Sequence, residues 1–176
     1  MIYNKILVAL DKSPQTCIVF EEALGMAQKY GSQLMFFHCI NSNKLNEPFL
    51  SVGTIGDVDM YGALHKQYQQ NLLHEIQQVD IWLESCCQQA NIKKISAQFK
   101  HGFGEAGKQI CSLAESWGAD LIILGRRGHR GITEILLGSV SSYVLHHAPA
   151  SVLVVQEQIF TKHKKFVMTT STQAKM

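Results

Sequence analysis

Apolar residues follow two patterns along this chain of 176 residues: short continuous runs, and longer stretches in which they recur every three or four positions. The short runs have the length of β-strands, and the longer stretches have the spacing of helix faces. The two kinds of segment alternate, which predicts an α/β fold with a doubly wound, five-stranded parallel sheet. The predicted strands span residues 5–10, 34–40, 95–101, 120–124 and 151–155, and the predicted helices span about 13–30, 63–90, 106–117 and 140–147.

Local residues refine three of these elements. Ser13-Pro14 is typical of a helix start, with serine as the N-cap and proline at the first helical position. In the third strand, Ile95, Ala97 and Phe99 alternate with polar residues, which indicates an edge strand with one wetter face. The apolar run at 152–155 is predicted to be a buried strand.

The segments outside this pattern divide the chain into one domain and a tail. Residues 1–156 form the predicted domain, with a long variable connection over 41–62 that holds one proline and three glycines. The 157–176 tail has four lysines against one glutamate, so it contributes +3 to the formal charge of +2 and leaves −1 for the domain. We expect a flexible, basic tail and a domain without the positive surface that nucleic acid requires.

Composition indicates a globular protein of the cytoplasm. Apolar residues make up 46% of the chain and charged residues 17%, a balance that is typical of folded domains. No apolar run approaches the roughly 20 residues that cross a membrane, and the first residues lack the apolar segment and cleavage site of a signal peptide. The five cysteines show no paired spacing of zinc or redox sites, so we expect reduced, mostly buried thiols.

The heptapeptide GFGEAGK, residues 102–108, has the spacing of a dinucleotide-binding fingerprint and comes close to a P-loop. The fingerprint belongs after the first strand and needs an acid at the far end of the next one. Here it follows the third strand, and Asp120 stands at the start of the fourth. The P-loop interpretation fails because Gln109 replaces the Ser or Thr that would hold magnesium. We therefore predict that these glycines form a tight turn between a strand and a helix.

A second glycine-rich segment, GRRGHRGITEILLGS, fits a phosphate better. Gly125 and Gly128 follow a strand, and after nine further residues Gly138 and Ser139 open the last helix. Glycines let backbone N–H groups approach an anion closely, and a helix start presents further N–H groups with a favourable dipole. Arg126 and two neighbouring arginines add positive charge. The segment therefore predicts a phosphate site.

The spacing of this segment, G-x-x-G, nine residues and then G-S, is similar to the ATP-binding signature of the universal stress protein family. The resemblance covers nearly the whole domain, from KILVALDKS through ADLIILGRRG to SVSSYVLHHAPASVLVV. It implies the strand order 3-2-1-4-5 and a Rossmann-like fold of the adenine nucleotide alpha hydrolase type. It also implies a homodimer, or a higher oligomer, that forms through the last strand at 152–155.

The resemblance further implies an ATP site between the first and fourth strands. Asp11 would hold the ribose hydroxyls, and the backbone near Ile40 would line the adenine pocket. The phosphates, with Mg²⁺ or Mn²⁺ bound through them, would lie at the glycine-rich segment. The residues implied there are Gly125, Arg126, Gly128, Gly138 and Ser139, with Val140 and Ser141 contributing their backbone N–H groups.

Other interpretations of these residues stay open from the sequence. Asp11 could cap a helix, although Ser13-Pro14 is the better cap, and Gly138-Ser139 could be an N-cap alone. His38 and His101 each end a strand without companion ligands. For them, packing or a hydrogen bond is favoured over a metal site.

The predicted function is an ATP-binding stress-response or signalling module, and the alternative is a slow ATP hydrolase or nucleotide-transferring enzyme. Phosphoryl transfer needs a positioned base, and Glu134 is the carboxylate that the glycine-rich segment offers. Related adenine-binding enzymes that cleave ATP carry a glycine-serine loop after the first strand, where this chain has DKSPQT. We therefore expect binding without fast hydrolysis. The glycine spacing argues against a family member that binds no nucleotide.

Overall fold

The structure is a computed structural model that describes residues 3–40, 58–126 and 137–156. Its strands are β1 (Lys5–Ala9), β2 (Gln33–Ile40), β3 (Ala97–Phe103), β4 (Leu121–Gly125) and β5 (Ser151–Val155), and its helices are α1 (Thr16–Tyr30), α2 (Val58–Ile92), α3 (Ala106–Trp117) and α4 (Ser139–His147). All neighbouring strands are parallel, and the sheet order is β3-β2-β1-β4-β5. The predicted fold class and strand order are confirmed.

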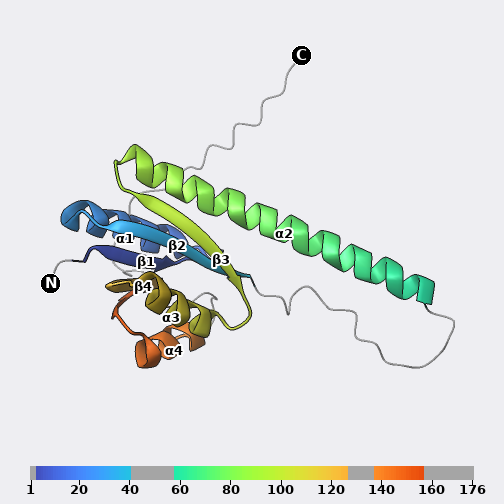
Figure 1. The fold of residues 1–176 in the computed structure, drawn as a ribbon. Coiled ribbons are helices and arrows are strands. Elements are labelled where there is room, and N and C mark those ends of the chain that lie inside the picture. The colour runs from blue at the N-terminus through green and yellow to red at the C-terminus, as the bar shows by residue number, and fades with distance from the viewer. Residues whose placement is uncertain (1–2, 41–57, 127–136, 157–176) are drawn as a thin grey trace, which may run out of the picture.

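Helices cover both faces of the sheet, α1 and α2 on one face and α3 and α4 on the other (Figure 1). Successive side chains of a strand point to opposite faces. Leu7 of β1 therefore packs toward α3 and α4, whereas its neighbours Ile6 and Val8 pack toward α1 and α2. All three are fully buried, so the middle of the sheet is apolar on both sides.

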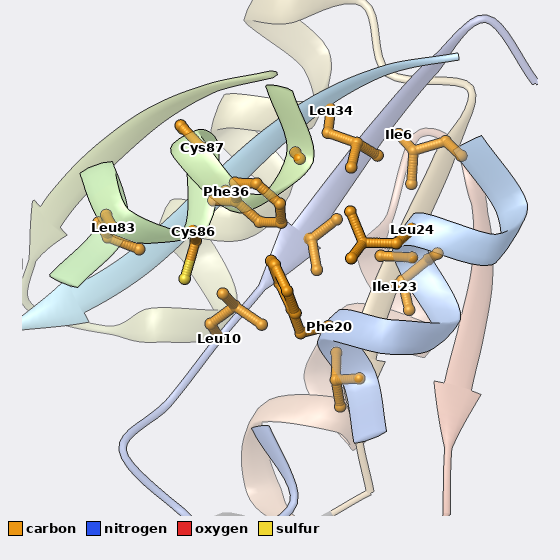
Figure 2. Packing of buried hydrophobic residues seen from close by; sticks show 14 of the residues in the cluster. Ile6, Leu10, Phe20, Leu24, Leu34, Phe36, Leu83, Cys86, Cys87 and Ile123 are labelled. Carbon is orange, nitrogen blue, oxygen red and sulfur yellow. The ribbon is translucent and has the colours of Figure 1, made fainter. Parts of the chain in front are cut away.

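The larger of the two apolar clusters lies between the sheet, α1 and α2. Phe20 on α1 and Phe36 on β2 have ring centroids 5.3 Å apart, and Leu83 and Cys86 of α2 belong to the same cluster (Figure 2). Leu10, just beyond β1, also points its side chain into this cluster. The first residue after β1 is thus still part of the core.

The two edge strands are less buried than the three strands between them. In β3, partly buried Ala97 and Phe99 alternate with exposed Gln98 and Lys100, which confirms the predicted edge position with one wetter face. The run at Val152–Val155 is only partly buried. The expectation of a buried strand was wrong there because β5 has a neighbouring strand, β4, on one side only.

Several element boundaries differ slightly from the prediction, and the starts of α1 and α2 differ most. α1 begins at Thr16 and not at Ser13, because residues 11–15 form a turn before the helix. α2 begins at Val58, so the predicted connection 41–62 is shorter. β3 ends at Phe103 and therefore includes the first glycine of GFGEAGK. The stretch 41–57 and the predicted tail 157–176 lie outside the described residues.

α2 is the longest helix, with 35 residues. Among its residues from 64 on, the buried side chains, Val79, Leu83 and Ala90 included, lie in the second half of the helix. Neither α2 nor any other described helix is both long and apolar enough to cross a membrane.

Gly104 of GFGEAGK forms the predicted turn between strand and helix, whereas Gly102 lies in β3 and Gly107 in α3, where they serve packing. A Cβ on Gly102 would lie 2.9 Å from the ring of Phe37, and a Cβ on Gly107 would lie 2.7 Å from the ring of Tyr143. Gly104 has a φ of +90°, which side chains with a Cβ rarely adopt. The segment lies at the edge of the sheet, with β2 and β1 between it and β4.

Asp120 lies at the opposite end of the sheet from the strand ends where a ligand is expected. Its Oδ2 accepts hydrogen bonds from the backbone N–H groups of Asn4 and Lys5, both at 2.9 Å. The carboxylate therefore ties the start of β1 to the start of β4. This confirms that Asp120 is not the acid of a dinucleotide site.

All five cysteines are free thiols, as predicted. Only Cys86 and Cys87 are buried, however, while Cys39 and Cys111 are partly buried and Cys17 is exposed. The expectation of mostly buried thiols was therefore wrong. Burial raises the pKa of Cys86 and of Cys87 to about 11, so both remain protonated, unreactive thiols at neutral pH.

Candidate functional site

The carboxyl ends of β1 and β4 meet in the middle of the sheet. Ala9 of β1 is paired with Leu124 of β4, and the strand order reverses between these two strands. Ligands of open α/β sheets bind outside the strand ends at such a reversal. Asp11 follows Ala9 by two positions, and Gly125 and Arg126 follow Leu124 directly. The predicted site residues on these two strands are thus brought together.

The turn after β1 is built around the carboxylate of Asp11. Oδ1 accepts hydrogen bonds from the Ser13 N–H at 3.1 Å, the Ser13 hydroxyl at 2.5 Å and the Thr16 hydroxyl at 2.9 Å. The Thr16 hydroxyl also contacts the Asp11 carbonyl oxygen. Such bonds from an aspartate to residues further along the chain stabilise a turn. Asp11 therefore stabilises the turn that precedes α1, and the predicted cap at Ser13 was wrong, because the N-cap of α1 is Gln15, without a side-chain cap bond.

Thr16 is a site residue that the sequence prediction missed. It is the first residue of α1, and its hydroxyl holds Asp11 in place. The signal in the sequence was the spacing D-x-S-x-x-T, in which both hydroxyl residues follow the acid closely enough to reach it.

The chain leaving β4 and the chain entering α4 are joined by a set of hydrogen bonds. The Arg126 carbonyl accepts the Gly138 N–H at 3.0 Å and the Ser141 hydroxyl at 3.0 Å. The Arg126 N–H donates to the Val155 carbonyl at 2.9 Å, which holds the same residue against β5. We call Arg126, Gly138 and Ser141 the loop neck. It fixes the start of α4 beside the end of β4.

The side chain of Ser141 is buried and hydrogen-bonded within the chain. Only 2% of its surface is exposed, and its hydroxyl also donates to the Gly138 carbonyl at 3.0 Å. The side chain thus belongs to the loop neck, and a contact with a ligand would be made by its backbone N–H, as the sequence implied.

The first turn of α4 presents backbone donors at the strand ends. Gly138 is the N-cap residue, in an extended conformation and without a side-chain cap bond. The first N–H groups of a helix have no acceptor within the helix, and the helix dipole makes this end favourable for an anion. Ser139 and Val140 are exposed. Their N–H groups can therefore meet a phosphate.

Gly125 lies where the end of β4 passes under the start of α1. A Cβ on Gly125 would make ordinary contacts, 3.4 Å from Val19 Cγ2 and 3.6 Å from Gln15 Oε1. Its φ does not lie in the left-handed region. Neither backbone conformation nor packing against described residues requires glycine here.

The remaining predicted site residues are Ile40 and Gly128. Ile40 is the last residue of β2 and is fully buried in the core, and the role of its backbone at a ligand pocket stays a prediction. Gly128 lies within 127–136, outside the described residues, together with the other two arginines of the segment.

His38 and His101 pack and form hydrogen bonds, as predicted. The His38 Nδ1–H donates to the Leu10 carbonyl at 2.8 Å, and its ring meets Trp82 of α2 edge to face, with centroids 5.4 Å apart. Burial lowers the pKa of His38, and the bond to Leu10 offsets this only in part. His101 donates from Nδ1 to Asp80 Oδ1 at 2.6 Å. Within the described ranges, no group of three or more His, Cys, Asp or Glu is arranged to hold a metal ion.

Comparison with known sequences gives a single family. Residues 2–156 match the universal stress protein family. Among curated proteins, the universal stress protein Sll1388 of Synechocystis sp. is 40% identical over 160 residues, which cover 89% of this chain and 99% of that protein.

Comparison with solved structures gives the same fold. The hypothetical protein MJ0577 aligns with a TM-score of 0.72 at 20% identity, over 90% of this chain and 99% of that one. A universal stress protein in complex with cAMP aligns at 0.57 and 19% identity, over 88% and 98% of the two chains. A universal stress protein from Archaeoglobus fulgidus in complex with dAMP aligns at 0.53 and 19% identity, over 89% and 100%.

Proposed function

The chain belongs to the universal stress protein family, and we propose that it binds ATP, or another adenine nucleotide, between Asp11 and the start of α4. In this role the protein is a nucleotide-dependent stress-response or signalling module. The observation that carries the proposal is the loop neck, because it holds the free N–H groups of α4 at the strand end next to Asp11.

The phosphates would lie against the first turn of α4. The N–H groups of Ser139, Val140 and Ser141 point out of the helix start, and the positive end of the helix dipole adds to their attraction for an anion. Gly125 supports this placement, since its glycine is not required by described packing and a bare backbone allows close approach. Gly128 would complete the phosphate contacts.

The ribose would lie against Asp11 and the base against the backbone at Ile40. Asp11 Oδ1 is already engaged by Ser13 and Thr16, so Oδ2, which has no hydrogen bond to the described residues, would accept the ribose hydroxyls. The engaged oxygen fixes the carboxylate before the ligand arrives, which lowers the entropy cost of binding. The adenine nucleotides bound by structural neighbours, cAMP and dAMP, support this ligand class.

Mg²⁺ or Mn²⁺ would be held mainly by the nucleotide. The described residues around the crevice offer one carboxylate, that of Asp11, and no cluster able to hold a metal ion. Phosphate oxygens are the usual ligands of Mg²⁺ at sites with few protein ligands. A metal ion would neutralise phosphate charge and would bind only with the nucleotide.

A homodimer would form through the outer edge of β5. This strand ends the sheet, and among the described residues only β4 pairs with it. An edge strand with apolar side chains and unpaired main-chain groups is a surface for pairing with a second copy.

Equilibrium binding of a fluorescent ATP analogue tests the proposal. Gly138→Val places a branched side chain at the start of α4, and Asp11→Ala removes the ribose acceptor, so we expect each to abolish saturable binding. Gly104→Ala is the matched control: it strains a glycine with positive φ at the far edge of the sheet and should leave the affinity within about threefold.

A wild-type affinity no better than that of Gly138→Val would refute nucleotide binding. The same preparation separates binding from catalysis, because ordinary enzymes turn over at about 1 per second or faster. Phosphate release above that rate would assign the chain to the hydrolases instead.

A further inference from the structure

His38 is hydrogen-bonded to Leu10, the residue that precedes Asp11. It comes from the end of β2, and its Nδ1–H donates to the carbonyl of Leu10 at 2.8 Å. The side chain is buried under α2, where Trp82 covers the ring. His38 therefore has no route to a ligand of its own, and its effect on the site must pass through Leu10.

The bond from His38 occurs where β1 stops pairing with β2. Leu10 N–H still donates to the Phe37 carbonyl at 2.9 Å, as in a regular parallel ladder. The next ladder bond would bring the Cys39 N–H to the Leu10 carbonyl. In the described chain that carbonyl instead accepts the bond from the imidazole. The side chain thus replaces a main-chain bond at the point where β1 turns toward the site.

Fixing this carbonyl fixes the peptide unit that carries Asp11. The atoms from Leu10 Cα to Asp11 Cα lie in one plane, so the direction of the Leu10 carbonyl determines the direction of the Asp11 N–H. The buried Leu10 side chain and its N–H bond hold the first half of that residue. The bond from His38 sets the remaining torsion, ψ of Leu10.

We propose that His38 is a positioning residue for nucleotide binding, which orients the Asp11 carboxylate through the carbonyl of Leu10. The inference rests on the proposed function, since it assigns His38 a role in the ribose contact of Asp11. The bonds from Ser13 and Thr16 set the carboxylate within its turn. The bond from His38 fixes the position of that whole turn relative to β2.

Two substitutions separate the hydrogen bond from the bulk of the side chain. His38→Asn keeps an N–H donor close to the position of Nδ1, whereas His38→Leu keeps apolar volume and removes the donor. Val79→Ala, a cavity in α2 on the same side of the sheet, is the control for loss of stability alone.

The readout is the ratio of the dissociation constants of 2′,3′-dideoxy-ATP and ATP, measured by competition with a fluorescent ATP analogue. An oriented Asp11 should distinguish the two ligands, because they differ in the ribose hydroxyls alone. For the wild type we expect a preference for ATP of about tenfold, the effect of one charge-assisted hydrogen bond. His38→Leu should reduce it to about twofold or less, while His38→Asn and Val79→Ala retain it.

The outcomes distinguish this inference from the function on which it rests. A wild type that binds neither ligand, or both equally, refutes nucleotide binding or the ribose role of Asp11, and the inference with it. A wild type that prefers ATP while His38→Leu shows the same preference overturns the role of His38 alone. Faster amide hydrogen exchange at Asp11 and Lys12 in ligand-free His38→Leu, but not in His38→Asn, is the expected second result; unchanged exchange contradicts the inference.

Discussion

Gly107 on α3 packs against the ring of Tyr143 on α4, so closely that a Cβ on Gly107 would lie 2.7 Å from Cδ1 of that ring. The first turn of α4 presents the proposed phosphate donors. The position of those donors therefore depends on a missing side chain in the neighbouring helix. We therefore expect a substitution at this contact to change both stability and nucleotide affinity.

Gly107→Ala should destabilise the protein although alanine is the better helix former. The gain in helix propensity is at most about 1 kcal/mol, whereas overpacking a tight contact costs about 1–3 kcal/mol. We expect a net loss of about 1–2 kcal/mol in the free energy of unfolding, measured by urea denaturation, with a weaker nucleotide affinity.

A second substitution checks the cause of that loss. Tyr143→Ala removes the ring, so the added cost of Gly107→Ala should shrink in the double variant, as expected for residues in contact. Equal costs in both backgrounds would show that the ring is not what excludes a side chain at Gly107.

Asp120→Ala should lower stability without changing nucleotide affinity. The carboxylate accepts the N–H groups of Asn4 and Lys5, and their loss at an exposed position should cost about 1–2 kcal/mol. Asp120→Asn keeps an acceptor oxygen and should cost less. Thermal denaturation with and without ATP measures both effects, and a fall in affinity for Asp120→Ala would contradict the assignment of this residue to the far end of the sheet.

The burial of His38 should make stability depend on pH. Burial lowers its pKa below the ordinary value of 6.5, so the unfolded chain binds a proton more readily than the folded one. The stability contributed by neutral His38 is present above about pH 6.5 and is lost as the pH falls through the folded-state pKa. In urea denaturation from about pH 7.5 to about pH 5, the wild type should lose more stability than His38→Asn.

Burial lowers the pKa of His38 most, the bond to Leu10 opposes this, and the charges that face the ring modify the result. Lys12 lowers its pKa further, while Asp11 and Glu75 raise it, and His101 occupies the paired position on β3. Identical pH profiles for the wild type and His38→Asn would show that these groups cancel the effect of burial.

Proline substitutions test β5 as the dimer edge. Ser151 and Val155 bond to the β4 side through their main chains, and main-chain groups alternate in direction along a strand. The N–H of Val154 therefore points outward and that of Leu153 inward. Because proline removes an N–H, Val154→Pro should give a folded monomer, while Leu153→Pro should unfold the sheet edge. Analytical ultracentrifugation and circular dichroism measure the two results, and a Val154→Pro dimer as tight as the wild type would refute the interface.

Much of the fold could be predicted from the sequence because its strands are apolar runs and its helices have regular apolar faces. The errors occurred where a few polar residues compete. Ser13 resembles an N-cap, but its N–H and its hydroxyl both donate to the carboxylate of Asp11, and the N-cap of α1 is Gln15. Such a competition depends on three-dimensional reach and not on the residue type at one position.

The location of the candidate site could be predicted from the sequence, but the hydrogen bonds that hold its residues in place could not. The spacing of Gly125, Gly138 and Ser139 predicted phosphate contacts at the end of the fourth strand, and the structure brings Gly125 and the start of α4 together there. The sequence contained no sign that the Ser141 hydroxyl closes the loop neck, or that His38 bonds to the residue before Asp11. These partners are 15 and 28 positions apart, and only the sheet register brings them together.

The loop neck also makes the segment between its two ends exchangeable. Arg126 and Gly138 are held one hydrogen bond apart, so the two anchor points stay in place whatever chain joins them. Lengthening a loop between fixed ends costs little, about 0.6 kcal/mol for each doubling. Segments of other lengths could therefore join Arg126 to Gly138 while the end of β4 and the start of α4 keep their positions.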